Sequence, residues 1–170
     1  ADQLKNGFDL IWGGKTDSIN EENTAANGWT YIDNRDEMNA LEAGSRSFAQ
    51  FNYNDLYNCT DNNNTPSIEE MTTKAIELLS ANEKGFFLMV EGAHIDKHSH
   101  SNLDNNMTEA LEEFDRTIQY VLDYAEKDGE TLVIVTADHE TGAITLNEDG
   151  SYSFTSGSHS SADVPLLVYG

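Results

Sequence analysis

Basic residues, cysteine and long apolar runs are all scarce in this chain of 170 residues. Nine Lys and Arg residues face 31 Asp and Glu residues, and the formal net charge of −22 excludes nucleic acid and anionic membranes as partners, because both require a basic surface. No apolar run approaches the roughly 20 residues that cross a bilayer, so no membrane span is predicted. Cys59 is the only cysteine and has no partner for an intrachain disulfide. The remaining composition, 38% hydrophobic, predicts one globular unit over residues 1–170.

Short apolar runs predict the strands. Three of them show little alternation, as is typical of strands that are buried on both faces. Two weaker candidates precede them. The strong runs are residues 86–90, 131–137 and 164–169, and the weaker ones are residues 8–12 and 29–32.

Helical patterns lie between these runs. Ser67 and Glu70 form a capping-box pattern at the start of a predicted helix over residues 67–79. A second helix is predicted over residues 105–127, before Gly129. Strands that alternate with helices predict an α/β fold with three layers, in which a mainly parallel sheet carries helices on both faces.

Two other segments have clear local signals. Residues 144–146 and 152–154 flank an Asp149-Gly150 turn and predict a hairpin. Residues 52–65 are polar and rich in asparagine, and they predict a long loop.

Carboxylates and histidines gather where the predicted strands end, which is where open parallel sheets bind ligands. Asp96 and His100 are four residues apart, so both side chains can lie on one side of a helical turn. Asp138 and His139 follow the next strand, and His159 precedes the last one. A single histidine of this kind is more often a surface side chain, but two strand ends that each supply a carboxylate and an imidazole favour zinc. The spacing alone predicts a hydrolase that uses divalent metal ions.

Four segments carry a resemblance to a known family. "FFLMVEGAHIDKHSH", "VIVTADHETG" and "SGSHSSADVPLLVYG", in that order, resemble the metal-binding motifs in the C-terminal half of alkaline phosphatases, and "GFDLIWGGK" resembles a strand and turn found earlier in that family. Phosphodiesterases and sulfatases share parts of the Asp-x-x-x-His and Asp-His patterns. "MVEG" and "TADHETG" favour the phosphatase branch.

The resemblance implies a metal-binding role for six residues and a substrate contact for one. It implies one complete zinc site, part of a second zinc site and part of a magnesium site. His94 and His98 match no ligand position, so we expect them beside the ligands or exposed. The implied set is Asp96, His100 and His159 for the first zinc, Asp138 and His139 for the second, Glu91 for magnesium, and Lys97 as a phosphate contact.

The catalytic nucleophile of the family has no counterpart here. In the family it is a serine or threonine in an Asp-Ser-Ala type of motif far upstream, together with a metal-bridging aspartate and a phosphate-binding arginine. Thr16-Asp17-Ser18 is followed by Ile19 and lies in the wrong part of the order. We therefore expect the chain to act only when joined to an N-terminal half and to be inactive alone.

The resemblance further implies a phosphate monoester as substrate, a homodimer, and a periplasmic or secreted location. Two alternatives stay open on the sequence. One is a non-catalytic metal-binding fragment, and the other is a relative of the phosphodiesterases or sulfatases.

Overall fold

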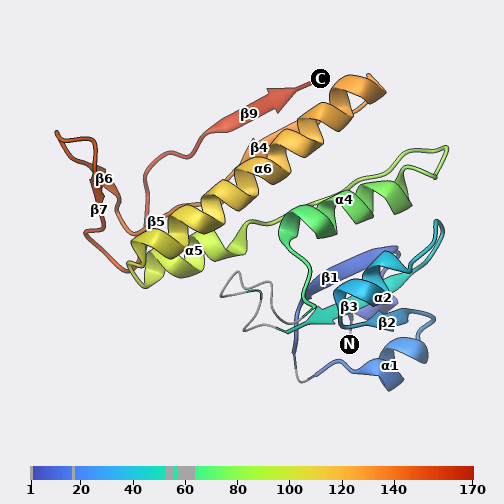
Figure 1. Cartoon of the computed structure of the whole chain (residues 1–170). Helices are drawn as coiled ribbons and strands as arrows, with labels where there is room; N and C mark the ends of the chain where they lie inside the picture. Colours follow the sequence, from blue (N-terminus) through green and yellow to red (C-terminus); the bar gives the residue numbers. More distant parts are fainter. Residues whose placement is uncertain (1, 17, 53–55, 57–63) are drawn as a thin grey trace. The chain divides into compact units, whose positions relative to one another are not determined.

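The computed structural model describes residues 2–16, 18–52, 56 and 64–170, which form two compact units, residues 1–90 and 91–170 (Figure 1). Most of the predicted loop over residues 52–65, including Cys59, lies outside the described residues. The ligands predicted from the sequence all belong to the second unit.

The first unit is built on a parallel sheet of three strands in the order β1-β3-β2. The central strand, β3, was not predicted, because Ser47 and Gln50 interrupt its apolar pattern. All five of its residues are nevertheless buried. The Ser47 hydroxyl is satisfied inside the unit, since it accepts a hydrogen bond from the Trp12 indole N–H at 2.9 Å. The strands are β1 (Leu10–Gly14), β2 (Thr30–Ile32) and β3 (Ser47–Phe51), and the helices are η1 (Gln3–Lys5), α1 (Glu21–Ala25), α2 (Arg35–Asn39) and α4 (Ile68–Leu79).

Helix α4 begins where its capping pattern predicts. The Ser67 hydroxyl accepts a hydrogen bond from the Glu70 N–H at 3.1 Å, and the Glu70 carboxylate accepts one from the Ser67 N–H at 2.8 Å. Its apolar face contributes Leu78 to a core that also holds Met38 and Phe51. The helix predicted over residues 67–79 is confirmed.

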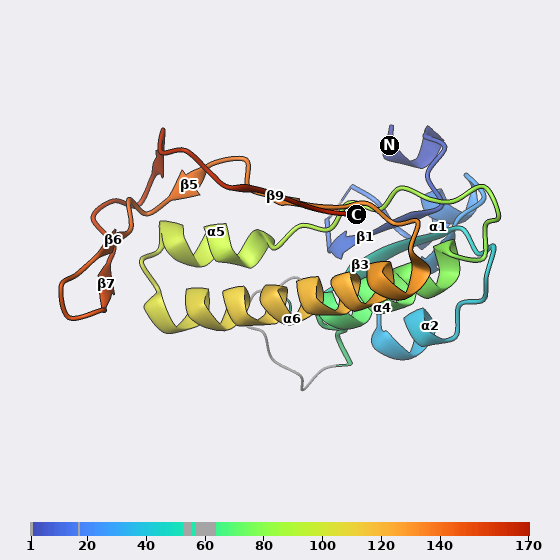
Figure 2. The same ribbon diagram turned by 90° about the horizontal axis from the view of Figure 1, so that it is seen from above.

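Two helices open the second unit. Helix α5 (Ala93–His100) lies alongside the longer α6 (Asp104–Asp128), as both views show (Figures 1 and 2). Gly92 permits this approach, because a Cβ atom there would lie 3.1 Å from the Phe114 ring. Gly129 ends α6 with a φ of 73°, so the predicted second helix is confirmed. No helix in the described part of the chain combines the length and apolar character needed to span a membrane.

The rest of the second unit is one long interrupted hairpin. Three antiparallel ladders are nested inside one another around a tip that contains the predicted Asp149-Gly150 turn. The inner ladder confirms the hairpin predicted for residues 144–146 and 152–154. From the outside inward the ladders are β4 (Val133–Thr136) with β9 (Leu166–Tyr169), β5 (Glu140–Thr141) with β8 (His159–Ser160), and β6 (Thr145–Leu146) with β7 (Tyr152–Ser153).

Two expectations about the strong apolar runs are wrong. Residues 86–90 pair with no strand in the described part of the chain, and Phe87 and Met89 are exposed. The runs 131–137 and 164–169 do form strands, but β4 and β9 are antiparallel. No helix separates them, and a parallel pair needs a crossover connection, so the chain returns by nested hairpins instead.

Candidate metal centre

Helix α5 brings the first two predicted ligands together. Asp96 and His100 are one turn apart, and the Asp96 Oδ1 atom lies 3.3 Å from the His100 Nε2 atom. About a third of each side chain remains exposed, so the pair is open to solvent.

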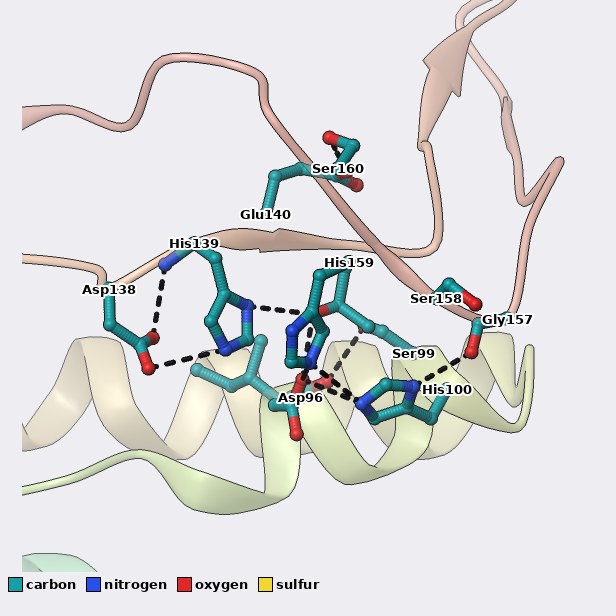
Figure 3. Close-up of polar contacts among 12 residues, drawn as sticks. Asp96, Ser99, His100, Asp138, His139, Glu140, Gly157, Ser158, His159 and Ser160 are labelled. Carbon is teal, nitrogen blue, oxygen red and sulfur yellow. Dashed lines mark hydrogen bonds and ion pairs between the residues drawn. The ribbon is translucent and has the colours of Figure 1, made fainter.

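Strand β8 brings the third predicted ligand to the same point. The His159 Nε2 atom lies 3.0 Å from His100 Nε2 and 3.6 Å from Asp96 Oδ1 (Figure 3). We call Asp96, His100 and His159 the Asp96 cluster. Its members are separated by up to 63 residues in the sequence and meet through the fold alone.

A backbone carbonyl fixes the orientation of the His100 ring. The His100 Nδ1–H group donates to the Gly157 carbonyl oxygen at 2.8 Å. In a neutral imidazole this leaves the Nε2 lone pair directed at the cluster. The backbone at Gly157 passes close to that of His100, and a glycine allows this because a Cβ atom there would lie 3.0 Å from the His100 carbonyl oxygen.

The spacing of the three ligand atoms fits a tetrahedral cation. Zinc bonds of roughly 2.0 to 2.2 Å at tetrahedral angles place neighbouring ligand atoms about 3.3 to 3.6 Å apart. Two of the observed separations, 3.3 and 3.6 Å, lie in this range, and the third, 3.0 Å between the two Nε2 atoms, is slightly shorter. One carboxylate and two imidazoles also form a donor set that suits zinc, so the cluster can hold three of its four ligands.

The second predicted pair lies beside the Asp96 cluster. The His139 Nε2 atom of the ring is 3.2 Å from Asp138 Oδ2, and the backbone N–H of His139 donates to Asp138 Oδ1 at 3.1 Å. The His139 ring stacks on the His159 ring with centroids 3.5 Å apart. The Asp138 side chain is 87% exposed, which leaves it free to bind a further group.

A threonine that the sequence reading missed connects the two groups. The Thr141 hydroxyl donates to Asp96 Oδ1 at 2.7 Å and lies 3.1 Å from His139 Nδ1. The signal that could have revealed it is strand alternation, because Thr141 follows His139 by two positions and shares its face.

The intervening Glu140 points away from this face. Its carboxylate accepts hydrogen bonds from the Ser160 hydroxyl and from the Ile144 N–H (Figure 3). The bond from Ser160 holds the pKa of Glu140 below its usual value. This carboxylate therefore stabilises the hairpin rather than facing the cluster.

The other residues singled out in the sequence lie apart from the cluster. Glu91 and Lys97 are exposed, and neither side chain bonds to Asp96, His100 or His159. His98 is buried on α5 and its ring centroid is 6.0 Å from that of the half-buried His94. Burial lowers the pKa of His94.

Comparison with known proteins identifies the family. The profile of the alkaline phosphatase family matches residues 4–169. The chain belongs to the alkaline phosphatase family. Alkaline phosphatase 3 of Bacillus subtilis (strain 168) is 36% identical over 130 residues, which are 76% of this chain and 28% of that protein.

Solved alkaline phosphatases share the fold. The enzyme from the Antarctic bacterium TAB5 matches with a TM-score of 0.77 and 28% identity, over 99% of this chain and 55% of that one. A mutant of the TAB5 enzyme with Mg bound in its M3 site matches with a TM-score of 0.73 and 28% identity, over 99% of this chain and 56% of that one. The predicted α/β fold with a parallel sheet and helices is thus confirmed. The chain spans about half the length of these solved alkaline phosphatases.

Gly142 makes the bend that directly follows β5, at the end of the ladder that pairs Thr141 with His159. Its φ is +98°, and a Cβ atom there would lie 2.6 Å from the Phe154 ring. Its N–H donates to the Ser158 carbonyl, and its own carbonyl accepts from the Thr155 and Ser156 N–H groups. The turn therefore depends on a residue without a side chain.

We predict that Gly142→Ala destabilises this hairpin by backbone strain of about 1 to 3 kcal/mol and by a steric clash that adds a comparable amount. Gly150→Ala is the matched control, because Gly150 also has a positive φ but open space around it. Amide hydrogen exchange at residues 155 and 156 measures the effect. Equal loss of protection in both variants would show that the contact with Phe154 is unimportant.

Proposed function

We propose that this chain is the metal-binding part of an alkaline phosphatase, a hydrolase of phosphate monoesters. The observation that carries the proposal is the convergence of Asp96 Oδ1, His100 Nε2 and His159 Nε2 at spacings that suit a tetrahedral cation. Membership of the alkaline phosphatase family supports the reaction class.

The proposed assignment gives each ligand a place. Asp96, His100 and His159 hold one zinc ion, and Asp138 with His139 holds part of a second zinc site. Glu91 contributes to a magnesium site, and the Mg-bound TAB5 mutant supports magnesium as a cofactor in this family. Bound metals would supply Lewis-acid stabilisation of the charge on a transferring phosphoryl group. We propose Lys97, which follows Asp96 on α5 and is exposed, as a contact to the substrate phosphate.

A further segment of the protein must supply the nucleophile under this proposal. The Ser18 hydroxyl is exposed and lies 3.4 Å from the Thr16 hydroxyl, whereas an activated nucleophile needs a base or a metal within reach. Asp17 lies outside the described residues. Within the second unit the apolar faces of the β4–β9 ladder are uncovered, because Ile134, Leu167 and Val168 are each more than half exposed, and this leaves room for a covering segment. Strands of this composition are normally covered on both faces.

A phosphate monoester substrate, a homodimer and a periplasmic or secreted location remain part of the proposal. They rest on the family resemblance of the three metal-binding segments. The strongly acidic composition supports none of them specifically, but bound divalent metals would let so acidic a chain hold a phosphate dianion.

Zinc binding tests the assignment of the first site. We predict that calorimetry on metal-free protein detects zinc binding tighter than about 100 μM at neutral pH, on the usual affinity scale. His100→Ala removes a ligand and should weaken binding by more than the roughly 10- to 100-fold typical of losing a supporting partner. His94→Ala is the control on the same helix and should leave the affinity unchanged. Equal losses in the two variants would refute the ligand assignment.

Activity tests the role of the chain. We predict that the 170-residue chain, supplied with zinc and magnesium, does not hydrolyse an aryl phosphate faster than metal-bound water does. A longer protein that includes the upstream segment should be active with an alkaline optimum, and Asp138→Ala or His139→Ala should cost it several orders of magnitude in rate. Rapid turnover by the short chain that is lost in Ser18→Ala would contradict this account.

A further inference from the structure

In the described metal centre the Thr141 side chain hydrogen-bonds to a member of each predicted ligand group. Its hydroxyl contacts Asp96 on α5 and His139, the residue directly before β5, and Thr141 itself is 7% exposed. In the β5–β8 ladder Thr141 is also the register partner of His159. The side chain is therefore held by its own strand and by the strand that carries the third ligand of the Asp96 cluster.

The chemistry of the groups around Thr141 determines which atom donates in each of its two hydrogen bonds. A hydroxyl has a single proton, and a carboxylate can only accept, so the Thr141 proton lies on the bond to Asp96 Oδ1. The contact with His139 Nδ1 must then be an N–H donation from the ring to the Thr141 oxygen. In the neutral imidazole, the lone pair of His139 Nε2 is then directed at Asp138 Oδ2, 3.2 Å away, an arrangement that a cation bound by both atoms would stabilise.

The consequence is the same for His139 as for His100. The Gly157 carbonyl holds His100 in the form with the proton on Nδ1, and the Thr141 oxygen holds His139 in that form. Both rings therefore present Nε2 as the metal-binding atom. A partner on the other nitrogen is how metal-ligating histidines are usually fixed, although the partner is more often a carboxylate, a carbonyl or water.

We propose that Thr141 is a positioning residue that couples the two metal-binding groups. Through one hydroxyl it fixes the tautomer of His139 and the orientation of the Asp96 carboxylate, so that each group is ordered by the same side chain. This inference rests on the proposed metal-binding function.

The shape of threonine suits the task. A β-branched side chain in a strand has few χ1 rotamers, so burial and branching together hold the hydroxyl in place. Valine has almost the same shape and lacks the hydroxyl, whereas serine keeps the hydroxyl and lacks the methyl group. Comparing Thr141→Val with Thr141→Ser therefore distinguishes the contribution of the hydroxyl's hydrogen bonds from the contribution of side-chain packing.

The tautomer of His139 is measured directly by ¹⁵N NMR of metal-free protein at a pH where the ring is neutral. We expect wild-type His139 to carry its proton on Nδ1, Thr141→Ser to retain this preference, and Thr141→Val to lose it. Thr145→Val is the matched control, because Thr145 lies on the exposed β6 strand of the same hairpin. If Thr141→Val does not fold, Thr141→Ala removes the same hydroxyl. Wild-type His139 protonated on Nε2, or an unchanged tautomer in a folded variant without the hydroxyl, would overturn the proposal.

Zinc calorimetry separates this inference from the proposed function. We expect Thr141→Val to weaken both zinc sites, each by roughly 10- to 100-fold, as for loss of a supporting partner. Thr141→Ser and Thr145→Val should bind as the wild type does. Absence of zinc binding by the wild type would defeat the proposed function, whereas wild-type binding matched by Thr141→Val would defeat only the coupling.

Discussion

The metal centre depends on the crowding of electron-pair donors around one point. Asp96 Oδ1 and the Nε2 atoms of His100 and His159 lie within 3.6 Å of one another. With the His100 proton held on Nδ1 by a carbonyl, its Nε2 lone pair faces the cluster, where either a proton on His159 Nε2 or a bound cation can meet it. The surrounding structure keeps this arrangement in place through the Gly157 carbonyl, the Thr141 hydroxyl and the ladder between β5 and β8.

The site is assembled from a rigid helix and a hairpin. Helix α5 sets the spacing of Asp96 and His100 through its own turn, while the nested ladders set the position of His139, Thr141 and His159. The hairpin is narrow and its outer ladder leaves apolar side chains bare on both faces. A partner segment that covers β4 and β9 would order the same hairpin that carries the ligands.

The sequence correctly predicted those helix ends and turns that are determined by residues close together in the chain. The capping box at Ser67, the left-handed Gly129 and the Asp149-Gly150 turn all act within a few residues, and their elements appear where expected. Strand pairing depends on distant partners, so apolar character alone could not show that residues 86–90 remain unpaired or that β4 and β9 are antiparallel. In the site, residue type and spacing indicated Asp96, His100 and His159, which the fold brings together. Thr141 escaped notice because its role lies in two hydrogen bonds, and a hydroxyl is not a typical zinc ligand.

Anomalous diffraction at the zinc absorption edge, from crystals of the protein grown with zinc, is the most direct test of the proposed centre. The account predicts a strong peak bounded by Asp96 Oδ1, His100 Nε2 and His159 Nε2, at roughly 2.0 to 2.2 Å from each atom. A second and weaker peak is expected next to Asp138 and His139. Zinc located elsewhere on the acidic surface, with no peak between these three atoms, would contradict the account.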